Sequence, residues 1–192
     1  SMLIAGVLVG GTLTWNLAAR AAYESAPYTV VIKEGDFEIR QYPELMLVST
    51  KMRVNAQGRD GSFMRLFRYI SGANGDEQKV AMTTPVFMGR SQQETEGQMG
   101  FVLPSEVVTS GVPNPTASDV QIRKRAEGRF AVVRFSGRMN EEKAKQQEQR
   151  LRQWLAAKGL EGEGAVETAG YDPPFTPGPL RRNEVLVRLT ER

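Results

Sequence analysis

The segment Ile39-Arg40-Gln41-Tyr42-Pro43-Glu44 has an altered second copy, Ile122-Arg123-Lys124-Arg125-Ala126-Glu127, 83 residues further along the chain. After an apparent insertion of two residues, Leu45–Val48 likewise matches Phe130–Val133. Similarity at one long period indicates that a single supersecondary unit is used twice. The elements around the two copies should therefore follow the same order.

Short apolar or alternating runs, separated by turn residues, surround both copies and predict strands. In the first unit we expect strands at Tyr28–Lys33, Phe37–Gln41, Leu45–Val54, Lys79–Met88 and Gln98–Leu103. In the second unit we expect them at Val120–Arg125, Arg129–Ser136, Ala165–Tyr171 and Glu184–Leu189. Pro85 indicates that its strand is interrupted or lies at an edge, because proline cannot donate a ladder hydrogen bond.

Each unit also contains one helical pattern. The first has apolar residues at helical spacing, namely Phe63, Leu66, Phe67 and Ile70. Asp60 or Ser62 can cap its start, and Gly72 can adopt the left-handed conformation that ends it. The second runs from Asn140 to Gly159 and has a narrow apolar seam.

Two ββαββ units predict an α+β fold, in which about eight antiparallel strands form a distorted barrel flanked by the two helices. A groove beside the helices would suit an apolar ligand. A chain of 192 residues is the usual size of one globular domain, which we place at residues 23–192.

Composition excludes several classes of function. The chain has no Cys and no His, which excludes disulfides, His or Cys metal sites and every mechanism that uses imidazole or thiolate. No paired carboxylates or nucleophile–base arrangement stand out, so we predict no catalytic residues and no metal site. The 25 Lys and Arg are interleaved with 22 Asp and Glu, which does not favour nucleic-acid binding.

Residues 1–22 differ from the rest of the chain. Met2–Ala19 carries no charge and is just long enough to span a membrane, although glycine and polar residues dilute it. An apolar stretch followed by Ala19-Arg20-Ala21 also resembles a signal peptide, but it lacks a basic start. We therefore expect a cleavable signal or an N-terminal anchor, with the protein exported, periplasmic or attached to a membrane. An N-terminal helix packed on the domain is the alternative.

Three further segments resemble the SOUL heme-binding protein family. They are Phe63–Gly72, Lys79–Val86, and Gly170–Phe175 followed by Arg181–Val185, in the family's order and with similar spacing. The resemblance covers about Tyr28 to Leu189. It implies binding of heme or a related tetrapyrrole in a shallow apolar groove beside the first helix, near the proline-rich loop before the last strand. It also implies kinship with effector-binding domains that hold amphipathic molecules.

The resemblance carries particular site residues over to this chain. Those we retain as cofactor-binding candidates are Phe63, Met64, Phe67, Arg68, Tyr171, Pro174, Phe175 and Arg181, and Asp60 and Pro173 lie beside them. Each also fits a structural role: the two helix phenylalanines share the apolar stripe of the core, and the arginines fit solvated or ion-paired positions.

Some members of the family are proposed to ligate heme iron through histidine, and this chain cannot do so. We expect hydrophobic binding without a strong axial bond. Tyr171, Tyr69, Met64 and Met88 are the conceivable ligands. Three alternatives remain open: a sensor for another amphipathic molecule, a tetrapyrrole-modifying enzyme, and a membrane-tethered protein-interaction module.

Overall fold

The computed structural model describes residues 23–53, 59–89, 96–173 and 175–190. The expected signal or anchor at residues 1–22 lies outside the described residues, and so does Pro174. Within the described ranges, no helix combines the length and the apolar character that crossing a bilayer requires.

One nine-stranded antiparallel sheet organises the molecule, with the order β2-β3-β9-β11-β10-β6-β7-β4-β8. Its strands from the first half of the chain are β2 (Thr29–Glu34), β3 (Phe37–Tyr42), β4 (Leu45–Met52), β6 (Val86–Gly89) and β7 (Gly97–Val102). Those from the second half are β8 (Val120–Arg125), β9 (Gly128–Ser136), β10 (Gly162–Gly170) and β11 (Arg182–Leu189). A separate parallel pair joins β1 (Glu24–Ser25) to β5 (Thr83–Thr84), and Pro85 separates β5 from β6 as its chemistry predicts.

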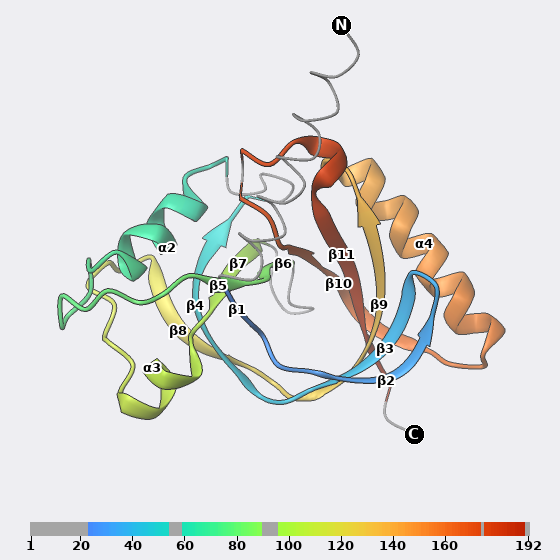
Figure 1. Ribbon diagram of the computed structural model, residues 1–192, viewed down its shortest axis with the longest axis horizontal. Helices are drawn as coiled ribbons and strands as arrows, with labels where there is room; N and C mark the ends of the chain where they lie inside the picture. Colours follow the sequence, from blue (N-terminus) through green and yellow to red (C-terminus); the bar gives the residue numbers. More distant parts are fainter. Residues whose placement is uncertain (1–22, 54–58, 90–95, 174, 191–192) are drawn as a thin grey trace, which may run out of the picture.

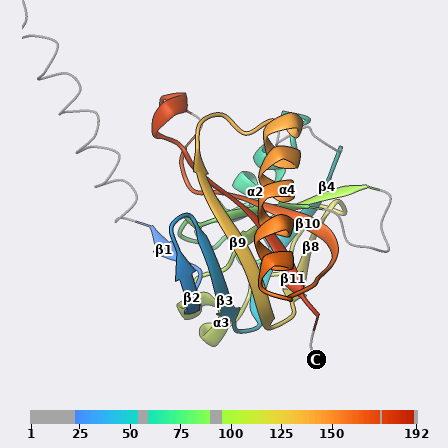
Figure 2. The ribbon, with the colours of Figure 1, turned by 90° about the vertical axis from the view of Figure 1, so that its right-hand side faces the viewer.

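The helices lie on the outside of the curved sheet (Figure 1). Helix α2 (Ser62–Ile70) packs on β4 and β7, whereas α4 (Glu141–Ala157) packs on β9, β10 and β11. The side view shows α4 running along this second group of strands (Figure 2). A short helix α3 (Ser105–Ser110) and a 3₁₀ turn η1 (Gly178–Leu180) complete the described part of the chain.

The α+β class and the duplication are confirmed, and the barrel is open. Without β2, the order from one edge is β3-β9-β11-β10 and from the other edge β8-β4-β7-β6. Each unit's first strand therefore pairs with the other unit's second strand, which relates the two halves by a pseudo-twofold axis between β10 and β6. Among the described residues, the edge strands β2 and β8 do not pair with each other, so the sheet does not close.

The strand register corrects one detail of the sequence alignment. In β3 and β9 Arg40 pairs with Phe130, and in β8 and β4 Arg123 pairs with Leu47. Leu47 is thus the equivalent of Phe130, at the same offset of 83 residues as the two arginines. The two-residue insertion that aligned Leu45 with Phe130 is wrong, because hydrogen-bonded register, and not local similarity, decides equivalence.

Buried apolar side chains form three clusters in the described residues. One lies between α2 and the sheet and includes Leu66, Val48 and Phe101, and another lies under α4 and includes Leu151, Leu155 and Val185. The third occupies the inner face of the sheet and includes Tyr42, Phe130 and Tyr171. This third cluster also holds the charged groups that are described next.

Candidate functional site

An apolar pocket of about 300 Å³ lies between α2, the β5–β6 segment and the chain that follows β10. Its lining residues are Tyr23, Phe63, Phe67, Met82, Thr84, Val86, Gly170, Tyr171, Asp172, Pro173 and Phe175. All but a few of them are aromatic or aliphatic, which is the usual character of a pocket for a largely apolar small molecule.

Helix α2 supplies the aromatic wall. Asp60 accepts hydrogen bonds from the Ser62 backbone N–H at 3.2 Å and the Ser62 hydroxyl at 2.7 Å, which fixes the start of the helix. Gly61 takes the left-handed conformation there, with φ of 86°. Phe63 and Phe67 then follow one turn apart with their rings stacked, the centroids 6.1 Å apart.

Arg65 attaches the same helix to the sheet. Its Nε donates to the Thr50 hydroxyl at 3.0 Å, and its Nη2 donates to the Lys51 carbonyl at 2.6 Å. These bonds to β4 fix the rotation of the helix, so Leu66 and Ile70 face the core while Phe67 stays 43% exposed at the pocket.

Tyr171 forms a polar floor to the pocket. Its hydroxyl donates to Glu184 Oε2 at 2.7 Å, and the Arg182 guanidinium lies 4.0 Å from the centre of its ring. Burial and the neighbouring Glu184 carboxylate raise the pKa of Tyr171 far above its ordinary value. This side chain is therefore a neutral phenol at every physiological pH.

Glu184 belongs to an ionic network behind that floor, in which Arg40, Glu38 and Glu184 are fully buried and Arg182 is half-buried. Arg40 donates to both of its oxygens, at 2.8 and 2.9 Å, and Arg182 donates to Oε1 at 2.7 Å. Burial favours the protonated acid, but the hydrogen bonds and charge of Arg40, with the charge of Arg182, outweigh it and hold the pKa of Glu184 below its usual range. Arg40 also donates to Glu38 at 2.7 Å and to the Tyr42 hydroxyl at 3.0 Å.

The loop between β10 and β11 closes the other side of the pocket. Arg181 Nε donates to the Thr176 carbonyl at 2.8 Å, and Asp172 accepts from the Arg182 backbone N–H at 2.5 Å. These bonds hold the loop against the start of β11. Phe175 projects from it with 77% of its surface exposed.

The structure brings four of the candidate residues together and separates the others. Phe63, Phe67, Tyr171 and Phe175 line the pocket, with the neighbouring Pro173. Met64 and Arg68 are exposed on α2 and do not line it, and Arg181 supports the loop. Pro174 lies outside the described residues.

Sequence reasoning missed part of the lining. Tyr23, Met82, Thr84 and Val86 line the pocket and are not among the candidates, although three of them lie in Lys79–Val86, one of the segments that resemble the family. The useful signal was that this segment resembles the family as closely as the helix does. Asp172 is the one charged residue of the described lining.

The possible iron ligands are restricted. Within the described ranges, His, Cys, Asp and Glu form no group of three or more that could hold a metal ion. The Tyr69 hydroxyl donates to the Pro113 carbonyl at 2.7 Å, and burial raises its pKa to about 12. Met88 lines a different pocket. In the described lining of the pocket beside α2, Met82 and Tyr23 have a sulfur or a phenol oxygen that is not bonded to the Glu184 network.

Comparison with known proteins assigns the family. The model of the SOUL heme-binding protein family matches residues 23–188. The chain belongs to the SOUL family. The match includes every described residue of the pocket, so the pocket is a feature of the SOUL domain and not of an added segment.

Named relatives agree with the SOUL assignment. Heme-binding protein 2 of Mus musculus is 33% identical over 160 residues, which covers 78% of this chain and 77% of that protein. Heme-binding protein 1 of Xenopus laevis is 27% identical over 157 residues, which covers 78% of this chain and 81% of that protein.

Solved structures share the fold of this SOUL domain at low identity. The C-terminal domain of EcmrR superposes with a TM-score of 0.57 and 12% identity, covering 86% of this chain and 99% of that domain. A hydrolase from Listeria innocua superposes with a TM-score of 0.57 and 13% identity, covering 83% of this chain and 94% of that chain. These likenesses confirm an effector-binding-like fold and carry no function at that identity.

Proposed function

We propose that this protein binds heme or a related tetrapyrrole in the pocket beside α2, without ligation by histidine. Membership of the SOUL family and the names of the relatives support a heme ligand. The observation that carries the position is the apolar pocket itself, which is lined by the half-buried Phe63 and by the exposed rings of Phe67 and Phe175.

Contact with these rings supplies the binding energy. If a porphyrin removes roughly 200 Å² of apolar surface from water, the gain is about 5 kcal/mol at about 25 cal/mol per Å². Loss of translational and rotational freedom then reduces this gain, so we expect modest affinity. The rings of Phe63 and Phe67 are nearly parallel, at 14°, and can offer aromatic contacts to a flat ligand.

Among the residues that the structure describes, the lining holds no cation for the propionate groups. Asp172 is the single charged residue of the described lining, and Arg68 and Arg181 lie outside it. We therefore propose that the apolar edge of the tetrapyrrole enters first and that its carboxylates remain in solvent.

Comparing hemin with metal-free protoporphyrin IX tests this binding mode. The Tyr171 phenol is engaged by Glu184, and no histidine exists, so the iron should add little to the affinity. We expect the two dissociation constants, measured by fluorescence quenching and absorbance, to agree within about tenfold. Protoporphyrin binding at least a hundredfold weaker would show that an iron ligand holds the heme.

A second candidate is a sensor for an amphipathic cation, which the lone carboxylate of Asp172 in an apolar lining favours. Crystal violet is a suitable probe. Saturable binding of crystal violet, with no saturable hemin binding, would favour this function over the first.

Because the family is defined by heme binding, and no catalytic arrangement stands out in the pocket, we propose a binding role and not catalysis.

Export or membrane attachment through residues 2–19 remains a proposal. The support is the absence of charge in Met2–Ala19. Fractionation of cells that express the full chain, compared with a chain beginning at Tyr23, tests it. The full chain should be in the membrane or exported fraction, and equal distribution of the two chains would contradict the proposal.

A further inference from the structure

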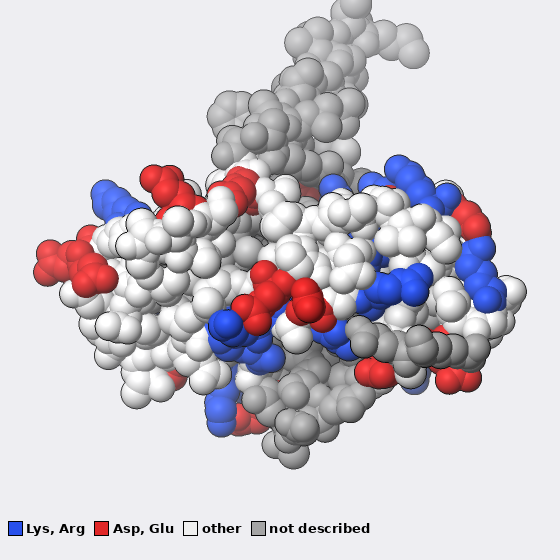
Figure 3. All heavy atoms as spheres, turned by 90° about the horizontal axis from the view of Figure 1, so that it is seen from below, with Lys and Arg blue, Asp and Glu red and all other residues white. Residues whose placement is uncertain are grey.

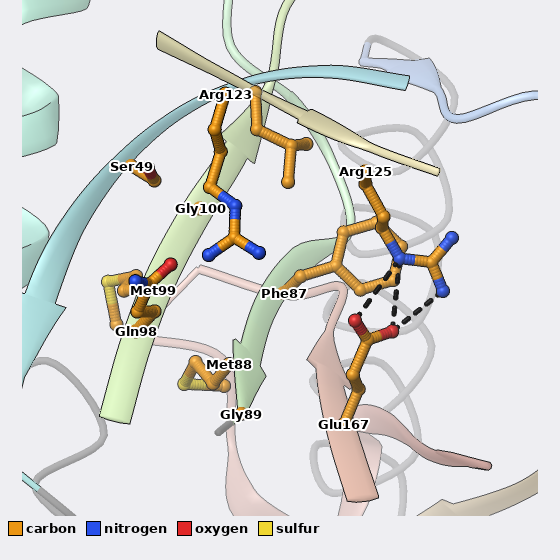
Figure 4. A pocket seen from close by; sticks show the side chains of 11 residues that line it. Ser49, Phe87, Met88, Gly89, Gln98, Met99, Gly100, Arg123, Arg125 and Glu167 are labelled. Atoms are coloured by element: carbon orange, nitrogen blue, oxygen red, sulfur yellow. Dashed lines mark hydrogen bonds and ion pairs between the residues drawn. The ribbon is translucent and has the colours of Figure 1, made fainter. Parts of the chain in front are cut away.

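A second pocket of about 160 Å³ lies on the inner face of the sheet, away from α2, and differs from the first in having arginine at its centre. Strands β4, β6, β7, β8 and β10 line it, with Leu47, Ser49, Phe87, Met88, Gly89, Gln98, Met99, Gly100, Arg123, Arg125 and Glu167. Figure 4 shows the Arg123 guanidinium projecting into the space between these strands.

The two arginines of this pocket have different surroundings. Arg125 is only 5% exposed, donates to Glu167 at 2.6 Å and lies over the Phe130 ring at 3.9 Å. Its charge is therefore neutralised by the protein. Arg123 is half-buried, and among the residues that the structure describes no hydrogen bond or ion pair engages its guanidinium.

The pseudo-twofold axis shows what Arg123 lacks. Its equivalent is Arg40, which lies between two carboxylates, those of Glu38 and Glu184. Gln121 precedes Arg123 by two residues, as Glu38 precedes Arg40, so the first carboxylate is replaced by an amide.

The second carboxylate is replaced in the same way. In β9 and β11 Val132 pairs with Leu186, and the equivalent pair in β4 and β7 is Ser49 with Gly100. Two residues before Leu186 stands Glu184, and two residues before Gly100 stands Gln98. Arg123 therefore has a neutral amide at each of the two positions where Arg40 has a carboxylate.

Smaller side chains at three other positions leave the space for this pocket. Leu47, Ser49 and Gly100 occupy the positions that Phe130, Val132 and Leu186 hold in the other half, and each is smaller than its equivalent. The pocket is therefore the space that larger side chains fill on the opposite side of the axis. A partly buried guanidinium in such a space favours an anion from outside, and its planar fork matches a carboxylate.

We propose that this second pocket binds the carboxylate of a small organic acid, with the Arg123 guanidinium taking the role that Arg40 has towards Glu184. Leu47 and Phe87, which belong to the inner-face cluster, give the pocket apolar walls, so the part of the acid that contacts them is apolar. Glu167 already neutralises Arg125, which leaves one positive charge for one carboxylate. This site is separate from the tetrapyrrole pocket and does not depend on it.

Titration of the full chain with benzoate, benzamide and inorganic phosphate tests the proposal. Binding is measured by calorimetry and by the NMR signals of Gly100 and of the Gln98 side chain. Benzoate should bind saturably and shift these signals, and benzamide and phosphate should bind at least tenfold more weakly. Arg123→Gln should weaken benzoate at least tenfold, whereas Arg129→Gln, which removes an exposed arginine of β9, should leave it unchanged.

Gln98→Glu gives an independent variant that restores the missing carboxylate. It should raise the melting temperature and weaken benzoate, because the new side chain pairs with Arg123 as Glu184 pairs with Arg40. The proposal is overturned if benzoate does not bind the unaltered protein, if benzamide or phosphate binds equally well, or if Arg123→Gln and Gln98→Glu bind benzoate as tightly as the original chain. Hemin affinity should be the same in both variants.

Discussion

Glu184 carries its charge inside the molecule, because three side chains donate four hydrogen bonds to its two oxygens. A buried ion pair is costly to build and more costly to break, since the remaining partner keeps an uncompensated charge. The network therefore fixes the relative positions of β3 and β11 more than it adds stability. It also holds Tyr171, the polar floor of the pocket beside α2, through the bond from its hydroxyl to Glu184.

Replacing Glu184 by Gln should destabilise the fold strongly. Arg40 would lose one of its two charged partners, keeping Glu38, and Arg182 would lose the carboxylate it pairs with; breaking a buried pair costs about 3–5 kcal/mol. The free energy of unfolding in urea measures this change. Glu44→Gln is the matched control, because Glu44 pairs with Lys124 in solvent and such exposed pairs contribute about 0–1 kcal/mol. Equal effects of the two substitutions would contradict the account of the network.

Stability should fall in acid because of the same carboxylates. The hydrogen bonds and charges of Arg40 hold the pKa of Glu184 and of Glu38 below the ordinary value. A carboxyl whose pKa is lower in the folded than in the unfolded protein stabilises the fold at pH values above its unfolded pKa of about 4.3. This contribution is lost as the pH falls towards the pKa values of the folded protein. Urea unfolding between pH 3 and 7 should show this loss. A slope unchanged in Glu184→Gln would contradict it.

At the scale of elements, patterns of alternation and capping predicted most strands and both long helices. The expected strand Val120–Arg125 is β8 itself, and Asp60 and Gly72 mark the ends of α2 as predicted. Helix α3 and the parallel pair of β1 and β5 were not predicted. They are short and depend on contacts between distant segments, such as the Ser105 backbone N–H with Glu24, which leave no local pattern.

The same limit applies to the structural role that the apolar stripe suggested for Phe67. Helical spacing placed Phe67 with Leu66 and Ile70, yet Phe67 is exposed, because the rotation of α2 depends on the bonds of Arg65 to β4. Spacing gives the apolar stripe but not which of its edges faces the sheet. Tyr23 was missed because nothing local indicates that this residue, directly before β1, lines the same pocket as α2.

The loop after β10 provides a second test of the pocket. Phe175 is 77% exposed, so Phe175→Ala should leave the melting temperature unchanged within about 1 °C. Since its ring lies at the rim, hemin affinity should fall by roughly three- to tenfold. Thermal denaturation and hemin titration of one preparation measure both quantities. A large loss of stability would mean that the ring supports the fold and not the ligand.

At the scale of the whole molecule, the two halves of the duplication give their equivalent arginines different surroundings. One half uses the arginine of its first strand to bind the protein's own carboxylates, and the other leaves the equivalent arginine facing a pocket. Basic and acidic side chains are mixed on the face shown in Figure 3, as the near-balanced composition predicts. The sequence shows the internal repeat, but the strand register was needed to find that Arg40 and Arg123 are equivalent and have different partners.

Hemin titration of the full chain, together with Phe67→Ala and Met64→Ala, tests the central claim most directly. Both residues are apolar, lie on α2 and are similarly exposed, at 43% and 48%, but only Phe67 lines the pocket. Saturable one-to-one binding followed by the Soret band should weaken about tenfold in Phe67→Ala and remain unchanged in Met64→Ala. Absence of saturable binding, or equal loss in both variants, would contradict the placement of a tetrapyrrole in this pocket.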